Sequence, residues 1–279
     1  MNGLAVDIGG TWLRWKALGE RGEKGRVAVA EADPLSVLER LVRREEAGAV
    51  GISFAGQVDG GRILASPNVP LPPMDLAAYL HERTGAAVAV ENDLDCAALA
   101  EAEEWKAEDL VVLYSGTGLG AGFVVRGALV RGHRGMAGEL GHIPYREAPF
   151  ACGCGKRNCV ELYASGSGLA KWRAFHRCEE EDLAALRDSE RSECREIYRN
   201  YLDGLLAAAG TAITLCNPEM LVLGGGVIRA NPWLLKKLSA RIASYALPIA
   251  CRELRIEMSR LENASLRGAE LLAERLASR

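Results

Sequence analysis

The chain has 279 residues, 49% hydrophobic and 25% charged, as expected for a globular protein of one large domain or two smaller ones. Its net charge of −3 excludes a general attraction to nucleic acid or to an anionic membrane. No run of about 18 apolar residues predicts a transmembrane helix, and the first residues lack the regions of a signal peptide. We expect unpaired cysteines and a cytoplasmic protein, because the eight cysteines show no secreted disulfide pattern.

The N-terminal part reads as alternating strands and helices. Apolar patterning predicts strands at residues 4–8, 12–18, 49–53 and 87–90, and helices at 34–46, 76–83 and 97–105. Residues 20–27 are polar and are expected to form a turn. Residues 56–73 contain three glycines and four prolines, which predicts an irregular binding loop.

The C-terminal part repeats this alternation. We expect strands at residues 110–113, 123–125, 220–223 and 254–258, and helices within 168–216, at 232–242 and at 266–276. The helical stretch should end at Asn217-Pro218, and Ser265 is expected to cap the last helix. The strand, glycine turn and strand at residues 7–18 recur at 114–125, which predicts two related α/β halves facing one another across a cleft.

One segment, which follows the second of these strand pairs, contains a metal-binding pattern. His142, Cys152, Cys154 and Cys159 supply one imidazole and three thiolates, which is a complete tetrahedral set for structural zinc. The alternative is a core histidine with unrelated buried thiols. Glu139 and Glu161 accompany the ligands, and zinc would aim these carboxylates and the free nitrogen of His142 at a bound molecule.

Three glycine turns follow predicted strands, at residues 9–11, 116–120 and 224–226. Backbone N–H groups in such turns bind phosphate, and Thr11 and Thr117 add hydroxyl donors. None of the turns fits the P-loop or the dinucleotide fingerprint. The set therefore indicates a different kind of nucleotide site, with three ordinary turns as the alternative.

Two aspartates stand at the ends of predicted strands. Asp7 precedes the first glycine turn, where a carboxylate beside phosphate requires a cation; we expect Mg²⁺ held through water, or else a cap of the local turn. Asp93 suits a group that accepts the proton of a hydroxyl nucleophile, and Asn92 beside it suits hydroxyl binding. Asp93 is alternatively part of an Asx turn, and Asp95 is expected to be a helix cap rather than a second base.

Together these motifs resemble those of ROK-type sugar kinases (repressor, open reading frame, kinase) in the actin-like ATPase superfamily. The matching segments run in family order from the first strand to the last helix: 6–11, 91–93 with 97–101, 115–120, 135–142, 152–161 and 217–226. The Glu-x-Gly-His and Cys-x-Cys signatures within them are the most specific. Departures at Asn158, Asp95 and the Asn68-Val69-Pro70 loop leave the identity of the sugar open.

The resemblance implies an α/β fold of two domains, the actin-like ATPase or ribonuclease H-like fold, with a cleft between the domains. Residues 1–106 would form a small N-terminal domain on which the C-terminal helix 265–279 packs. Residues 107–264 would form a large domain that carries the zinc-binding segment 139–161. A homodimer is also implied.

The resemblance further implies the roles of single residues. Asp93 would be the general base of the phosphate transfer. The residues implied to bind ATP are Asp7, Gly9, Gly10, Thr11, Gly116, Thr117, Gly118, Gly224 and Gly225. The residues implied to bind sugar hydroxyls are Asn68, Asn92, Asp93, Glu139, His142 and Glu161.

The expected activity is that of a kinase dependent on ATP and Mg²⁺, with structural Zn²⁺, which phosphorylates the 6-hydroxyl of a hexose. Glucose is the first choice of substrate, followed by N-acetylmannosamine, N-acetylglucosamine, mannose and fructose. Two alternatives belong to other classes: a non-catalytic sugar-binding protein and a sugar-responsive repressor. The repressor is disfavoured because the first predicted strand begins by Leu4 and leaves no room for a helix-turn-helix domain before it.

Overall fold

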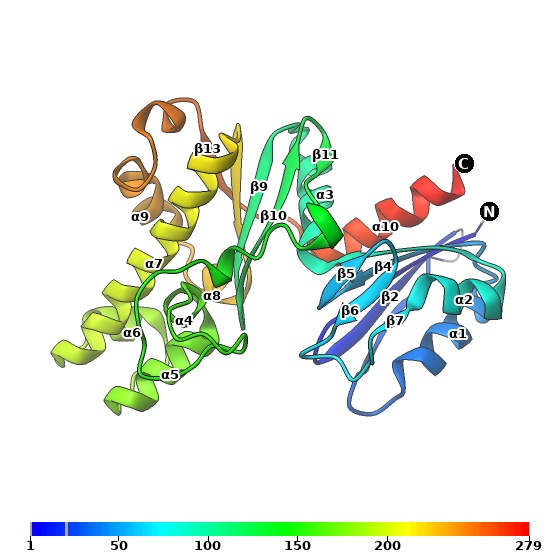
Figure 1. Ribbon diagram of the computed structural model, residues 1–279, viewed down its shortest axis with the longest axis horizontal. Coiled ribbons are helices and arrows are strands. Elements are labelled where there is room, and N and C mark those ends of the chain that lie inside the picture. The colour runs from blue at the N-terminus through cyan, green and yellow to red at the C-terminus, as the bar shows by residue number, and fades with distance from the viewer. Residues whose placement is uncertain (1, 20–21, 279) are drawn as a thin grey trace. The chain divides into compact units, whose positions relative to one another are not determined.

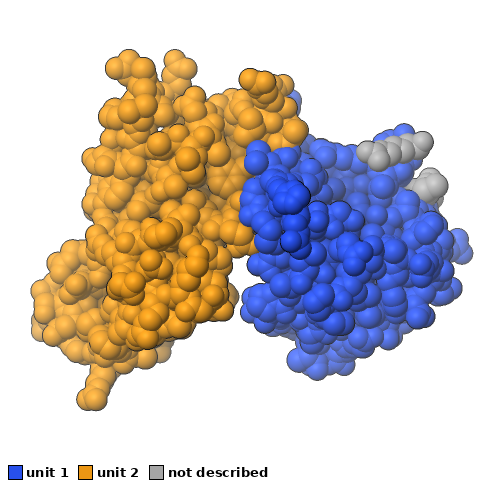
Figure 2. All heavy atoms as spheres, viewed as in Figure 1, with its two compact units in different colours: residues 1–106, 129–137, 261–279 blue, residues 107–128, 138–260 orange. Residues whose placement is uncertain are grey.

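The computed structural model describes residues 2–19 and 22–278, which divide into two compact units (Figure 1; Figure 2). Unit 1 comprises residues 1–106, 129–137 and 261–279, and unit 2 comprises residues 107–128 and 138–260. Each unit has its own hydrophobic core and its own five-stranded sheet with parallel and antiparallel pairs. The predicted α/β class is therefore confirmed.

The sheet of unit 1 has the strand order β3-β2-β1-β4-β8. Its strands are β1 (Gly3–Ile8), β2 (Trp12–Leu18), β3 (Lys24–Ala28), β4 (Ala49–Phe54) and β8 (Ala87–Asn92). The hairpin partners β1 and β2 are antiparallel, whereas β4 lies parallel to both β1 and β8. The carboxyl ends of β1, β4 and β8 consequently meet at one edge of the sheet.

Four helices and a small second sheet complete unit 1. The helices are α1 (Pro34–Arg44), α2 (Leu76–Thr84), α3 (Asp93–Trp105) and α10 (Ala264–Ala277). The small sheet contains β5 (Gln57–Asp59), β6 (Arg62–Ala65) and β7 (Met74–Asp75), and the 3₁₀ turn η1 (His133–Gly135) packs against β5. Helix α1 begins after Asp33, whose side chain accepts a hydrogen bond from the Ser36 N–H group.

The last helix, α10, is part of the core of unit 1. It packs against α3, β1 and β4 (Figure 1). Lys16 on β2 donates to both carboxylate oxygens of the buried Glu270, at 2.9 and 3.0 Å. The backbones approach closely, because a Cβ atom added to Gly51 would lie 2.0 Å from the Ala269 carbonyl oxygen. Only glycine at position 51 therefore lets α10 lie against the sheet.

The substitution Gly51→Val is expected to destabilise unit 1 by about 3 kcal/mol or more, because its side chain must displace the helix backbone. Thermal unfolding followed by circular dichroism measures the change. Gly226→Ala is the matched control, since a Cβ there meets no atom within 4 Å. Equal melting temperatures of the two variants would contradict this packing.

The sheet of unit 2 repeats the arrangement of unit 1, with the order β11-β10-β9-β12-β13. Its strands are β9 (Leu110–Ser115), β10 (Leu119–Val125), β11 (Ala128–Leu129), β12 (Met220–Gly224) and β13 (Arg255–Met258). The hairpin β9–β10 is antiparallel, and β12 pairs in parallel with β9 and β13. The sequence repeat thus reflects two halves with the same sheet order, as predicted.

Unit 2 also contains helices. They are α4 (Glu161–Ala164), α5 (Gly166–His176), α6 (Leu183–Asp188), α7 (Ser192–Cys216), α8 (Gly226–Ala230) and α9 (Leu234–Arg241), with the 3₁₀ turns η2 (Leu140–His142), η3 (Ile242–Ser244) and η4 (Pro248–Cys251). Helix α7 ends, as predicted, where Asn217 adopts a left-handed conformation before Pro218. Over residues 2–19 and 22–278, no helix combines the length and the apolar character needed to cross a membrane.

Several local predictions are wrong. Strand β3 begins at Lys24 and so occupies the second half of the segment predicted as a turn at residues 20–27, of which 20 and 21 lie outside the described residues. Strands β5 and β6 lie within the loop predicted to be irregular at residues 56–73. These short or polar strands are stabilised by pairing with their neighbours, which periodicity does not reveal. The cap of α10 is Asn263, not Ser265, and its side chain accepts from the Leu266 N–H group at 3.0 Å.

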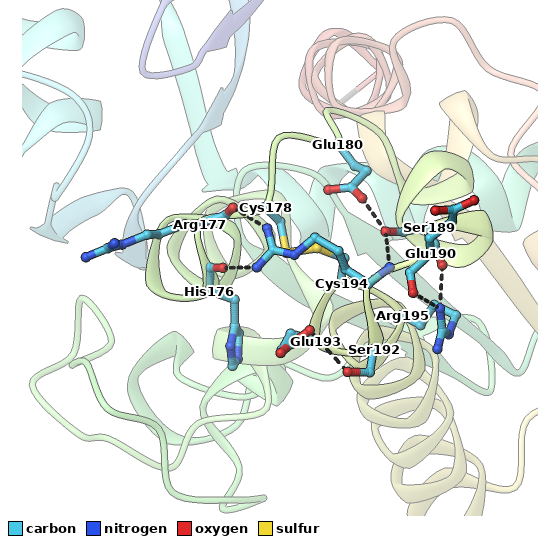
Figure 3. Close-up of a disulfide and its surroundings, with 11 residues drawn as sticks. His176, Arg177, Cys178, Glu180, Ser189, Glu190, Ser192, Glu193, Cys194 and Arg195 are labelled. Carbon is cyan, nitrogen blue, oxygen red and sulfur yellow. Dashed lines mark hydrogen bonds between the residues drawn. A yellow bond between two sulfur atoms is a disulfide. The ribbon is translucent and has the colours of Figure 1, made fainter.

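The prediction that all cysteines are unpaired is also wrong. Cys178 and Cys194 form a disulfide (Figure 3). Cys178 follows α5, Cys194 lies in the first turn of α7, and α6 lies between them in sequence. Arg191 strengthens the same junction by donating to the carbonyl oxygens of Arg177 and His176 at 2.6 and 2.9 Å. The bridge therefore closes the connection between α5 and α7.

Removing this bridge with the double substitution Cys178→Ser and Cys194→Ser is expected to cost about 3 kcal/mol of unfolding free energy, from the entropy of the 16-residue loop. Urea denaturation measures the loss, and a phosphine reductant should destabilise the natural chain but not the variant. Thiol titration in denaturant checks the pairing directly. Six reactive thiols are expected without reductant and eight with it; eight in both would contradict the disulfide.

Candidate active site and metal cluster

Asp7 lies buried on β1, next to the edge where the parallel strands of unit 1 end. Its Oδ1 accepts from the Ser53 hydroxyl at 2.9 Å. Its Oδ2 accepts from the Asn263 amide at 3.3 Å and from Arg14 at 3.5 Å. Burial raises the pKa of Asp7, and these donors partly oppose that rise because they stabilise the carboxylate. The donors come from other elements, so the Asp7 side chain links the sheet to the start of α10.

The first glycine turn leads from β1 into β2, and Gly10 and Thr11 are exposed. The turn is closed by the Gly9 N–H group, which donates to the Trp12 carbonyl oxygen at 3.0 Å. The backbone of Asn68 lies against Gly10. Asn68 is exposed, so unit 1 brings this predicted sugar-binding residue beside the first predicted phosphate turn.

Asn92 and Asp93 lie at the junction of β8 and α3. The Asn92 side chain caps α3, accepting from the N–H groups of Leu94 at 2.9 Å and Asp95 at 3.4 Å, and its amide donates to the Gly56 carbonyl oxygen at 3.0 Å. Asp93 is the first helical residue and is half-buried. The positive end of a helix favours an ionised carboxylate, which is the form that accepts a proton. The prediction of Asp95 as the cap is wrong, because Asn92 fills that role and Asp95 is buried within the first turn of the helix.

The other two glycine turns pack together in unit 2. They follow β9 and β12, which are parallel neighbours, so both turns lie at the same sheet edge. Gly225 has a φ of 87° and a Cβ added to it would lie 2.4 Å from the Ser115 carbonyl oxygen, which leaves no space for a side chain. Thr117 and Gly118 are exposed, and Gly224 is buried behind the turn. The structure thus unites two of the three predicted phosphate turns.

The four predicted metal ligands also meet in unit 2. One candidate ligand atom from each of His142, Cys152, Cys154 and Cys159 lies within 4.8 Å of all the others. The Cys152 and His142 atoms, Sγ and Nδ1, are 3.6 Å apart, and the sulfurs of Cys154 and Cys159 are 3.4 Å apart. Three sulfurs and one imidazole nitrogen at these separations fit a tetrahedral zinc ion. We call this group the His/Cys cluster.

Two carboxylates flank the His/Cys cluster. Glu139 precedes the 3₁₀ turn η2, in which residues three apart share a face, and its Oε2 lies 3.7 Å from Nε2 of His142. A metal-bound histidine is commonly oriented by such a carboxylate on its second nitrogen. Glu161 begins α4; its Oε1 lies 3.3 Å from the Cys152 sulfur, and its Oε2 accepts from the Leu119 N–H group at 3.0 Å. Glu161 therefore touches both the cluster and the second glycine turn.

The protonation of the thiols depends on their mutual contacts. Burial raises the pKa of Cys159 to about 12, and the neighbouring thiols add to this effect. Burial also raises the pKa of Cys152. For Cys154, burial acts in the same direction, but hydrogen bonds from the Lys156 backbone and the other thiols bring its pKa below the usual value. Binding of a divalent cation would release the protons that remain on these thiols, because cysteine binds a metal ion as the thiolate.

Sequence reasoning missed several residues that support these groups. Ser53 and Asn263 hold the Asp7 carboxylate, and the buried Tyr201 donates to the Ser115 hydroxyl at 2.9 Å. An asparagine three residues before Leu266 is a capping signal that could have identified Asn263. Ser53 and Tyr201 carry no such signal, since their partners are distant in sequence.

Comparison with known proteins shows which protein family the chain resembles. The model of the ROK family matches residues 3–276. The glucokinase of Thermotoga maritima is 30% identical to the chain, over 98% of each protein. The N-acetyl-D-glucosamine kinase of Erwinia tasmaniensis is 35% identical, over 81% of this chain and 80% of that protein.

A solved structure shares the fold. It is a ROK family glucokinase from Streptomyces griseus in complex with glucose and AMPPNP. The TM-score is 0.79 at 26% sequence identity, and the alignment covers 99% of this chain and 100% of that chain. The two mixed sheets described above are thus those of a ROK structure, and the predicted actin-like fold class is confirmed.

Proposed function

The chain belongs to the ROK family, and we propose that it is a sugar kinase that transfers the γ-phosphate of ATP to the 6-hydroxyl of a hexose. Glucose is the first choice of substrate. The glucokinase of Thermotoga maritima, which aligns over almost its whole length, supports this choice. So does the Streptomyces griseus relative, which was solved with glucose and an ATP analogue.

The nucleotide is assigned to the glycine turns and Asp7. The proposed ATP-binding residues are Asp7, Gly9, Gly10, Thr11, Gly116, Thr117, Gly118, Gly224 and Gly225. Exposed positions in the first two turns, Gly10, Thr11, Thr117 and Gly118, support this assignment, because phosphate oxygens can approach the backbone there. Mg²⁺ would neutralise charge on the phosphates as the bond to the leaving group breaks. Asp7 would hold it through water, with Ser53 and Asn263 keeping the carboxylate oriented.

Asp93 is the proposed general base. One observation carries this assignment: Asp93 lies at the positive end of α3, on the sheet edge where β1 leads into the first phosphate turn. Its carboxylate would accept the proton of the 6-hydroxyl as that oxygen attacks the γ-phosphorus. Asn92 and Asn68 are proposed to contact other sugar hydroxyls, and the cap holds Asn92 in a fixed orientation.

The His/Cys cluster is the proposed zinc site, formed by His142, Cys152, Cys154 and Cys159. Zinc would fix the backbone of the segment as a four-coordinate structural ion. Glu139, the Nε2 atom of His142 and Glu161 are proposed to bind sugar hydroxyls. With Cys152 ionised, its sulfur no longer donates to Oε1 of Glu161, which leaves this oxygen available to accept from a sugar.

The proposal is tested by ADP release with ATP and Mg²⁺ across a panel of hexoses and N-acetylhexosamines. A single sugar with a kcat/KM far above the rest is expected, and phosphorylation of its 6-hydroxyl can be read by ³¹P NMR. An N-acetylhexosamine in first place would favour the alternative of an N-acetylglucosamine or N-acetylmannosamine kinase, which the Erwinia tasmaniensis relative supports. Sugar binding without any turnover would instead indicate a non-catalytic or regulatory ROK protein.

The proposed reaction also bears on the location and the partners of the protein. ATP as phosphate donor places the reaction in the cytoplasm, and the net charge of −3 gives no reason to expect a nucleic-acid partner. A homodimer is proposed from the family resemblance alone, and light scattering would measure the mass of the assembly against the 30.0 kDa chain.

A further inference from the structure

The segment that follows the last cluster ligand, residues 161–167, is bonded to the second phosphate turn, residues 115–119. The side chain of Glu161 makes the first bond, since its Oε2 accepts from the Leu119 N–H group at 3.0 Å. The same oxygen lies directly beside Gly118. Glu161 is the second residue after Cys159, so one short stretch of chain separates a metal ligand from a contact with the turn.

Backbone groups of the 161–167 segment hold the rest of the turn. The Gly166 and Ser167 N–H groups donate to the carbonyl oxygens of Gly116 and Thr117, at 2.8 and 3.0 Å respectively. The turn therefore depends on this segment for its conformation and not only on strands β9 and β10.

One further bond fixes the first residue of the turn, Ser115, which is also the last residue of β9. The buried Ser115 hydroxyl donates to the Ala164 carbonyl oxygen at 2.7 Å, and it accepts from Tyr201. Because Ala164 ends the short helix α4 that Glu161 begins, the same four-residue helix is bonded to the turn at both of its ends.

The other side of the 161–167 segment is held by the His/Cys cluster. Cys159 is fully buried, and the next N–H group, that of Val160, donates to the Ile143 carbonyl oxygen beside His142 at 3.1 Å. The Cys152 thiol lies 3.3 Å from Oε1 of Glu161. A metal that joins His142, Cys152 and Cys159 would thus fix the position from which Glu161 reaches Leu119.

We propose that the His/Cys cluster positions the second phosphate turn through the 161–167 segment, with Glu161 as the positioning residue, so that zinc occupancy sets the affinity for the nucleotide. The inference rests on the proposed function and deepens it. It gives the metal site a role in nucleotide binding, in addition to the sugar contacts proposed above for the residues around it. Glu161 acts here through the Leu119 N–H group and not on the phosphate itself.

Calorimetric titration with Mg²⁺ and AMPPNP, without sugar, tests the contact made by Glu161. Glu161→Ala removes the acceptor of the Leu119 N–H group and is expected to weaken binding roughly tenfold, the effect typical of losing a hydrogen bond to a charged group. Glu161→Gln retains an oxygen that accepts the same bond, so its Kd should stay within about threefold of the natural chain. Glu147→Ala, at an exposed position of the same loop, is the matched control.

Removal of zinc with a chelator tests the role of the metal without any substitution. The expected result is the same weakening of AMPPNP binding, with faster amide hydrogen exchange in residues 115–119 while the exchange of β1 and β4 in unit 1 is unchanged. Zinc added back should restore both readouts.

The outcomes separate the inference from the proposed function. AMPPNP binding that is equal in the natural chain, Glu161→Ala and the zinc-free protein would overturn the inference and leave the kinase proposal standing. Failure of the folded, zinc-loaded natural chain to bind AMPPNP at all would overturn both. If Glu161→Ala does not fold, the Glu161→Gln variant and the zinc-free protein decide the question.

Discussion

Turnover of the Asp93→Asn variant is expected to fall by about 10³-fold, while the Kd for the sugar changes little. An amide cannot take the proton of the attacking hydroxyl, and a positioned general base contributes a factor of this order. Asparagine has almost the same shape, and its side-chain oxygen can still accept from the Leu94 N–H group, as Asp93 Oδ1 does at 3.0 Å beside the Asn92 cap. The loss should therefore appear in kcat, measured by ADP release, and not in sugar affinity, measured by calorimetry.

Asp75→Asn is the matched control for this variant. Asp75 caps α2 in the same unit, and asparagine caps a helix equally well. The control should turn over at the natural rate. If Asp93→Asn retained turnover within about threefold of that control, the assignment of Asp93 as the base would be wrong.

The second large effect is expected for Cys154→Ser. Cys154 is the exposed member of the His/Cys cluster, so serine there removes a metal ligand without opening a void in the core. Loss of a structural metal costs about 4 kcal/mol or more, which corresponds to a fall in melting temperature of roughly 10 °C. Metal analysis of the purified protein should show zinc in the natural chain and little in the variant.

Cys251→Ser serves as the comparison for the cluster variant. This cysteine is partly buried and free, and it lies outside the cluster. Its replacement should leave both the zinc content and the melting temperature close to the natural values. A zinc-free Cys154→Ser protein with the stability of this comparison would show that the cluster does not act as a structural metal site.

Several features that are determined by residues close together in the sequence were predicted correctly. The bounds of β2 at residues 12–18 agree with the prediction because a glycine turn marks its start. The metal ligands are separated by a few residues, so their spacing alone predicted the His/Cys cluster. Asn217-Pro218 ends α7 for an equally local reason, since proline disfavours helix at the preceding residue.

Contacts between residues that are distant in the sequence could not be predicted in this way. Cys178 and Cys194 are 16 residues apart, on the two sides of α6 in the sequence, and nothing in their spacing distinguishes them from unpaired cysteines. The contact between the turns at 115–119 and 224–226 arises from the parallel pairing of β9 with β12. The roles of Asp93, Glu139 and the sugar-binding residues stay predictions.

Unit 1 is assembled from segments far apart in the chain, since α10 packs against β1 and β4, which are formed more than 200 residues earlier. During synthesis on the ribosome, the sheet face that contains Gly51 must remain uncovered until α10 emerges. All residues of unit 2 lie between positions 107 and 260, so it can fold before unit 1 is complete. Premature termination within α10 would consequently release a chain with a folded second unit and an exposed apolar sheet, which is a substrate for chaperones and proteases.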